Sequence, residues 1–147
     1  MALLQLSRIR VLAIGKVKRP WLLDGIAFYA KRLPGLEVVE LKDSTQAKEA
    51  DAVRNARKPA ERLVLLTEEG RKLDSLRFAE QLGDWASQRV ALVIGGADGH
   101  SPALRQEADA LLSLSALTFP HELARLVLME QLYRASTILQ GGPYHRT

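Results

Sequence analysis

Short apolar runs alternate with longer amphipathic stretches along this chain. Residues 8–16, 36–43, 62–67 and 89–96 are rich in valine, isoleucine and leucine, the composition of buried strands. The run 89–96 is apolar up to its closing glycine pair, which is typical of a parallel strand covered on both faces. The stretch 114–117 predicts one more short strand.

Helix-like spacing of apolar residues fills the intervals between these runs. The predicted helices are residues 19–33, 44–58, 76–88, 103–112 and 121–140. The expected capping residues are Ser44 or Thr45, Asp74 or Ser75, and Ser101 followed by Pro102. We expect Gly141 and Gly142 to end the last helix.

Because strands and helices alternate throughout, the sequence predicts an α/β fold with a mainly parallel sheet and helices on both faces. No repeat, low-complexity run or linker divides the chain, so we expect a single domain spanning residues 1–147. Ligands of such sheets bind beyond the carboxyl ends of the strands. The predicted helix 121–140 is apolar on most sides, so we expect it to pack between the sheet and another subunit.

Composition excludes several classes of protein. The chain has 147 residues, 47% of them hydrophobic and 26% charged, as in a globular domain, and no run approaches the ~18 apolar residues of a membrane span. Its first residues lack the features of a signal peptide, so we expect a cytoplasmic protein. The absence of cysteine excludes disulfides and thiolate chemistry, and three widely spaced histidines predict no metal site.

The segment IGGADGHSP, residues 94–102, is the strongest local signal for a ligand site. A glycine pair after a buried strand lets backbone approach a ligand closely, although a tight strand-to-helix turn explains the pair equally well. The spacing matches neither common glycine-rich phosphate motif, and Asp98 would place a carboxylate beside a phosphate. If the loop binds a ligand, we expect one without phosphate.

A second unusual segment is LSLSALTFPH, residues 112–121. Small and hydroxyl side chains precede a proline there, so backbone groups of residues 115–119 are candidates for binding a ligand. The alternative is a connecting loop that only packs Phe119.

Charged residues suggest two further features. Glu130 and Arg134 have the helical spacing of an ion pair, whereas nearby Arg125 has no obvious partner. Lys16, Lys18 and Arg19 cluster after the first predicted strand, either as a solvated face or as contacts to a phosphate backbone. The net charge of +4 is a mild bias toward anionic partners.

Four segments, taken together, resemble one family over nearly the whole chain. They are IRVLAIGKVKRPWLLDGIAFYAKRL, LVIGGADGHSP, LSALTFPHELARLVLMEQLYRA and GGPYHR. These motifs resemble the RlmH-type ribosomal RNA large subunit methyltransferases, which are members of the SPOUT (trefoil-knotted, α/β-knot) methyltransferases. The resemblance implies a C-terminal trefoil knot that binds S-adenosyl-L-methionine. It also implies a homodimer, without metal or membrane, that methylates N3 of a pseudouridine in an intersubunit-bridge hairpin of 23S rRNA within the assembled 70S ribosome.

The resemblance also implies which residues form the cofactor pocket. They are Leu66, Gly95, Gly96, Leu114, Ser115, Ala116, Leu117, Thr118 and Phe119. We expect the cations that contact RNA to be Lys16, Lys18, Arg19 and Arg125. One position departs from the family, where an acidic residue commonly follows the third strand and this chain has Thr67. Either Glu68 or Glu69 substitutes for that residue, or the position is unimportant.

The C-terminal residues Tyr144, His145 and Arg146 are the candidate catalytic group. N3 of pseudouridine must lose a proton, and an imidazole with an ordinary pKa near ~6.5 suits that step. Tyr144 would stack on the base or bond its edge, and Arg146 would hold a phosphate or the developing anion. We expect Pro143 to turn these residues back over the ligand pocket; the alternative is a tail that only packs across the dimer and orders the knot.

A different class of protein also fits the alternation of strands and helices. A non-enzymatic α/β binding module, such as a flavodoxin-like nucleotide binder or a ribosome-associated factor without catalysis, has the same pattern. Binding of S-adenosylmethionine and methyl transfer to ribosomes distinguish the two.

Overall fold

The computed structural model describes residues 3–146, and its strands form one five-stranded sheet. The strands are β1 (Ile9–Ile14), β2 (Glu37–Leu41), β3 (Glu61–Lys72), β4 (Arg89–Ile94) and β5 (Ala110–Ser113). They lie in the order β2-β1-β4-β3-β5, and each neighbouring pair is parallel. The predicted α/β class with a parallel sheet is therefore confirmed, and the carboxyl ends of the strands meet at one edge.

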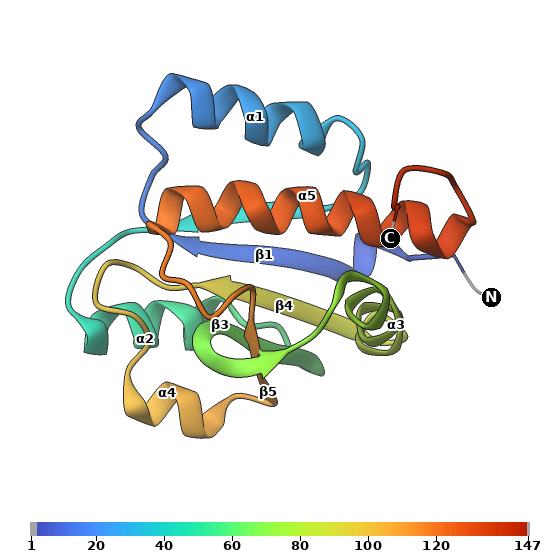
Figure 1. Cartoon of the computed structure of the whole chain (residues 1–147). Helices are drawn as coiled ribbons and strands as arrows, with labels where there is room; N and C mark the ends of the chain where they lie inside the picture. The colour runs from blue at the N-terminus through green and yellow to red at the C-terminus, as the bar shows by residue number, and fades with distance from the viewer. Residues whose placement is uncertain (1–2, 147) are drawn as a thin grey trace.

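Helices cover both faces of this sheet, as predicted. They are α1 (Pro20–Ala30), α2 (Gln46–Ala56), α3 (Ser75–Trp85), α4 (Pro102–Glu107) and α5 (His121–Gln140), with a short 3₁₀ turn at Leu6–Arg8. Helices α3 and α5 pack on one face and α2 and α4 on the other, while α1 lies outside α5 (Figure 1). No helix within residues 3–146 has the length and apolarity needed to cross a bilayer.

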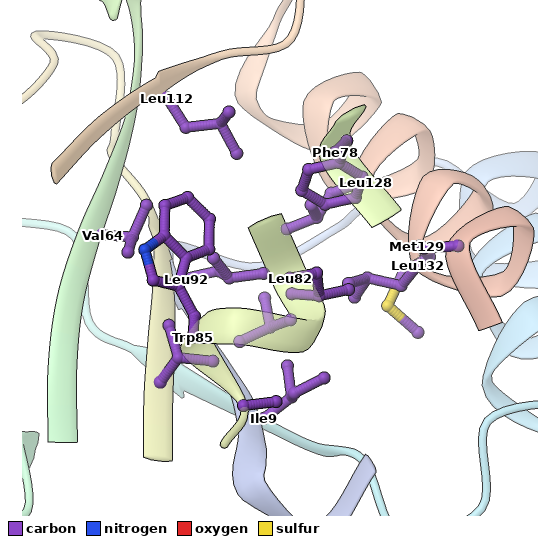
Figure 2. Close-up of a cluster of buried hydrophobic side chains, with 14 of the residues drawn as sticks. Ile9, Val64, Phe78, Leu82, Trp85, Leu92, Leu112, Leu128, Met129 and Leu132 are labelled. Carbon is purple, nitrogen blue, oxygen red and sulfur yellow. The ribbon is translucent and has the colours of Figure 1, made fainter. Parts of the chain in front are cut away.

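The sheet has a hydrophobic core on each face. In β1, Val11 and Ala13 belong to the core under α3 and α5, whereas Leu12 and Ile14 belong to the core under α2 and α4. Because both faces are covered, the strand is apolar at successive positions rather than alternating. Figure 2 shows the larger core, where Trp85 of α3 lies between the sheet and side chains of α5.

Side-chain caps start three of the helices at predicted positions. Thr45, Asp74 and Ser101 each accept a hydrogen bond from the backbone N–H three residues later, at 3.2, 2.9 and 3.1 Å. Gly141 has a φ of 76°, the left-handed conformation that ends α5. These local signals are set by neighbours in sequence, which explains why the sequence alone located them.

The strand predicted at residues 114–117 is wrong. The strand is instead β5 at Ala110–Ser113, and α4 ends at Glu107 rather than continuing to residue 112. Because leucine and small residues continue through this stretch, periodicity alone cannot locate the strand within it. Pairing with residues 64–66 of β3 decides its position.

Strand β3 holds β5 at two places. Leu66 and Arg71 both pair with Leu112, so the register of the pairing shifts between these two residues of β3. A Cβ atom on Gly70 would lie 2.6 Å from the backbone N and C atoms of Leu112. The two backbones therefore approach closely because residue 70 has no side chain.

We expect Gly70→Ala to lower the free energy of unfolding by about 1–3 kcal/mol, the usual cost of overpacking. The atoms that the new methyl group meets are backbone atoms of β5, which cannot rotate away. Urea denaturation measures the effect. Gly83→Ala in α3 is the matched control, because its added Cβ meets only Leu139 Cδ1 at 3.8 Å, and alanine favours a helix. Equal stability of the two variants would contradict this prediction.

Candidate active site

A cavity of about 760 Å³ opens at the carboxyl end of β4, beside the middle of β3 and beyond the end of β5. Three segments line it: residues 66–69, which lie within β3, and the loops 94–100 and 114–121, joined by Arg105 and Ala124. Its volume falls in the range of pockets that bind cofactor-sized molecules. This is the edge at which parallel α/β sheets bind their ligands.

The cavity brings together residues that the sequence separates by up to 58 positions, from Leu66 to Ala124. Eight of the nine residues expected to bind the cofactor line it, and Ala116 is the exception. The eight are Leu66, Gly95, Gly96, Leu114, Ser115, Leu117, Thr118 and Phe119. The parallel sheet explains this convergence, because β3 lies between β4 and β5, and the other two segments follow the carboxyl ends of those strands.

Hydroxyl groups hold the loop at residues 114–119 in place. Ser113 Oγ donates to the carbonyl of Ser115 at 2.8 Å, and Leu117 N–H donates to Ser115 Oγ at 3.0 Å. Thr118 Oγ1 donates to Glu68 Oε2 at 3.0 Å, which ties this loop to β3. The small and hydroxyl residues of the segment therefore have local partners as well as a place on the cavity wall.

Close packing within the chain leaves little room for a side chain at Gly95 or Gly96. A Cβ on Gly95 would lie 3.1 Å from His100 Cε1, and one on Gly96 would lie 3.2 Å from both carboxylate oxygens of Glu49. The tight-turn interpretation therefore accounts for both glycines, and the same residues also form part of the cavity wall.

His100 lies under the glycine loop and is buried, with 6% of its surface exposed. Its Nε2 atom has no hydrogen-bond partner within the described residues. Burial lowers the pKa of His100, although the nearby carbonyls of Val93 and Leu66 act in the opposite direction, and Arg105 lowers it further. We therefore expect a neutral imidazole at physiological pH.

Lowering the pH is expected to destabilise the protein through His100. Its folded pKa lies below 6.5, so the unfolded chain takes up a proton first as pH falls. The contribution is complete above about pH 6.5 and declines below it, by up to about 1.4 kcal/mol per pH unit. Urea denaturation of wild type and His100→Leu between pH 5 and 8 measures this difference. A difference that stays constant with pH would exclude the effect, since the other titrating groups are common to both proteins.

Acidic side chains dominate the charge of the cavity. Glu68, Glu69 and Asp98 line it, and Arg105 from α4 donates from Nη1 to Glu69 Oε2 at 3.0 Å. Thr67 also lines it, and the two residues after Thr67 are the acids that bond Thr118 and Arg105. Among residues 3–146 no three histidine, aspartate or glutamate side chains gather as a metal-binding group.

The basic loop after β1 lies beside the cavity. Lys16, Lys18 and Arg19 are exposed, and the backbone N–H groups of Lys18 and Arg19 donate to Glu122 in the first turn of α5. His121, which precedes Glu122, lines the cavity. The loop that carries these three cations is therefore bonded to the residue that follows a wall residue of the cavity.

Arg125 does not share this position, and the expectation that it contacts RNA is wrong. Its side chain is 5% exposed, pairs with Glu40 Oε2 at 2.6 Å, and donates to the carbonyl of Gly15 at 2.8 Å. Arg125 thus links α5 to the ends of β1 and β2, and has no exposed surface for a phosphate. Its partners lie 85 and 110 residues away, so the spacing of residues in the sequence could not identify them.

The C-terminal tail folds back along α5 instead of over the cavity of its own chain. Tyr144 Oη donates to Glu130 Oε2 at 2.8 Å, and the Tyr144 ring packs on Tyr133 with centroids 4.7 Å apart. Partial burial and the bond to Glu130 raise the pKa of Tyr144. The residues of α5 that the tail contacts begin at Glu130, nine residues after His121, which lines the cavity. Nine residues correspond to about 14 Å along the helix. The predicted Glu130–Arg134 pair is confirmed at 2.6 Å and anchors this arrangement.

His145 also contacts α5, with Nδ1 lying 3.1 Å from Arg134 Nη1. A guanidinium only donates hydrogen bonds, so Nδ1 is the acceptor here and a neutral ring carries its hydrogen on Nε2. In this arrangement the accepting nitrogen of His145 is occupied. The side chain can donate through Nε2 but has no free lone pair to accept a proton.

Comparison with known families agrees with this geometry. A family model described as a predicted SPOUT methyltransferase matches residues 7–145. The chain belongs to the SPOUT methyltransferase family. This SPOUT chain is 78% identical, over 100% of both chains, to the ribosomal RNA large subunit methyltransferase H of Synechococcus sp. (strain RCC307). It is 56% identical to the protein of the same name from Parasynechococcus marenigrum (strain WH8102), over 95% of this chain and 97% of that one. The resemblance inferred from the sequence motifs is confirmed.

A solved structure shares the fold of this SPOUT chain. The SpoU methyltransferase AviRb from Streptomyces viridochromogenes, crystallised in complex with the cofactor AdoMet, aligns with a TM-score of 0.51 and 21% sequence identity. The alignment covers 97% of this chain and 64% of that one, so this chain spans less than two thirds of its length. At this identity the likeness concerns the fold.

Sequence reasoning missed several residues of this SPOUT site. Arg105, which lines the cavity, and Glu122, which bonds the loop after β1, were not assigned a role, and His100 and His121, which both line the cavity, were considered only as metal ligands. A signal for Arg105 existed, because it lies one helical turn after the predicted cap Ser101 and so beside the glycine loop. The other three depend on contacts between distant segments.

Proposed function

We propose that this chain is an S-adenosyl-L-methionine-dependent methyltransferase that methylates N3 of a pseudouridine in the intersubunit-bridge hairpin of 23S rRNA on the assembled 70S ribosome in the cytoplasm. The observation that carries the proposal is 78% identity over the full length of a ribosomal RNA large subunit methyltransferase H. The cavity at the carboxyl edge of the sheet supports it. Residues 1–147 act as one SPOUT domain with a knotted C-terminal part, for which the double pairing of β5 with β3 is the local support.

The chemistry of the cavity fits the cofactor. S-adenosylmethionine carries a sulfonium, an ammonium and one carboxylate, and when bound it supplies the methyl group on its sulfonium sulfur. Three carboxylates of the cavity oppose the two positive charges, and Leu66, Leu114 and Phe119 offer apolar surface to the adenine. Two side chains at the cavity, His100 and Arg105, each keep a buried nitrogen without a partner among the described residues.

The tail carries the groups that the acceptor base needs. We assign His145 to take the N3 proton, Tyr144 to stack on the base or bond its edge, and Arg146 to hold a phosphate or the anionic base. Because Arg134 occupies Nδ1 of His145, the ring must leave that contact or rotate before it accepts a proton. A tail that stays on α5 leaves His145 a positioning role only.

A homodimer would bring a tail to each cavity. Within one chain the tail contacts α5 well away from the cavity, so the second copy is the natural source of the catalytic group. The outer helix α1 exposes Trp21, Leu23 and Phe28, at 63%, 47% and 50% of their surfaces. An apolar surface of this kind on the α1–α5 layer supports pairing between copies. Lys16, Lys18 and Arg19 would contact the RNA backbone.

Calorimetry followed by methyl transfer tests the proposal. We expect the protein to bind S-adenosylmethionine, and labelled methyl groups to appear in 23S rRNA when intact 70S ribosomes are supplied, far more than with free subunits. Mass spectrometry of the modified nucleoside locates the methyl group on N3. A chain that binds no S-adenosylmethionine would be the non-enzymatic module, and equal labelling of free 50S subunits would remove the requirement for the assembled ribosome.

A further inference from the structure

The charged side chain of Arg105 has one buried hydrogen-bond donor without a partner among the described residues. It lies in α4, lines the cavity, and its side chain is 30% exposed. Nη1 donates to Glu69, whereas Nε is buried without a partner among residues 3–146. An unpaired buried donor on a guanidinium is unfavourable, so this edge of Arg105 is suited to an acceptor that the chain itself does not supply.

The charges around Arg105 indicate what kind of acceptor this is. Of the described residues that line the cavity, Arg105 alone is an arginine or lysine, whereas Glu68, Glu69 and Asp98 are acids. A ligand with two positive groups and one negative group matches this arrangement. The negative group belongs beside Arg105, because the acidic side chains on the wall would repel it.

We propose that Arg105 binds the α-carboxylate of S-adenosylmethionine and so selects the intact amino-acid end of the cofactor. This inference rests on the proposed function. A guanidinium presents paired, parallel donors that match the two oxygens of a carboxylate. Glu69 bonds Nη1 and holds the guanidinium in position. Glu69 is itself 72% exposed on its side chain, so water competes for that contact and Arg105 remains available to a ligand.

A competing role for Arg105 is stacking on the adenine ring, which a guanidinium also does well. The two roles differ in which part of the cofactor they involve. Stacking does not depend on the carboxylate, so removing the carboxylate from the ligand separates them.

The experiment measures binding of two ligands by calorimetry, S-adenosylmethionine and its decarboxylated form. We expect the wild-type protein to bind S-adenosylmethionine at least tenfold more tightly than the decarboxylated form. Arg105→Met should weaken binding of S-adenosylmethionine by about tenfold to a hundredfold, the range for hydrogen bonds to a charged group. The affinity of the same variant for the decarboxylated ligand should stay within about threefold of the wild-type value. Arg105→Lys should be intermediate, because it keeps the charge without the paired donors.

Arg54→Met is the matched control. Arg54 pairs with Glu107, also on α4, at 2.5 Å but does not line the cavity, so its loss should not alter the preference between the ligands. Equal weakening of both ligands by Arg105→Met, or no weakening, would overturn the assignment. Wild-type protein that binds neither ligand would instead refute the proposed function. The wild-type comparison needs no variant, so a misfolded variant does not prevent the test.

Discussion

Replacing His145 with alanine should lower kcat for methyl transfer to 70S ribosomes by about 10²–10⁴-fold, the usual contribution of a general acid–base group. The affinity for S-adenosylmethionine should stay unchanged, because His145 lies outside the cavity of its own chain and contacts Arg134. Single-turnover methyl transfer and calorimetry give the two readouts. A variant that methylates at the wild-type rate would leave the tail with a structural role only.

His145→Gln separates proton transfer from hydrogen bonding. Glutamine keeps an N–H donor but takes up no proton. If His145 accepts the N3 proton, His145→Gln should lose as much of kcat as His145→Ala, because neither side chain takes up a proton. Recovery of most of the activity by glutamine would show that donation from Nε2 is sufficient, which is the role compatible with the contact to Arg134.

Replacing Arg10 with methionine should lower the free energy of unfolding by about 3–5 kcal/mol, the cost of leaving a buried charge without its partner. Arg10 of β1 donates to both oxygens of Glu61, each at 2.7 Å, and to the carbonyl of Ala56 at 2.8 Å. Glu61 is 2% exposed and retains only the N–H of Lys58, at 3.0 Å. Urea denaturation at pH 7 measures the loss.

The pH dependence of that loss identifies its cause. Burial alone would raise the pKa of Glu61, but the hydrogen bonds from Arg10 and Lys58 outweigh it and hold the pKa below 4.5. The pair therefore stabilises the wild type above about pH 4.5, and the contribution declines as pH falls through the lowered pKa. Without Arg10, burial raises the pKa of Glu61, so Glu61 takes up a proton at a higher pH than in the wild type. The difference in the free energy of unfolding between the variant and the wild type therefore narrows toward acid pH.

Two further variants control the Arg10 prediction. Arg10→Met combined with Glu61→Leu should recover most of the stability, since replacing both partners of a buried pair is often neutral. Arg54→Met, which breaks the more exposed pair with Glu107, should cost far less. An undiminished loss in the double variant would mean that packing, rather than the unpaired charge, causes the effect.

Much of this protein follows from residues that are close in sequence. The caps Thr45, Asp74 and Ser101, the left-handed Gly141 and the apolar runs of the strands identify most elements, because a cap or turn depends on neighbours a few positions away. Motifs in the same segments sufficed to identify the SPOUT family. They also named eight residues that line the cavity.

Tertiary structure decided the rest, since the deciding contacts join distant residues. The position of β5 depends on pairing with β3, and Arg125 is buried by partners 85 and 110 residues away. The tail turns onto Glu130 and Arg134 rather than over its own cavity because those side chains bond it there. The sequence alone therefore determined the elements, the family and most of the pocket residues. Only the folded chain decided which charges are buried, which donor on Arg105 lacks a partner, and where the C-terminal residues lie, because each depends on segments that meet only after folding.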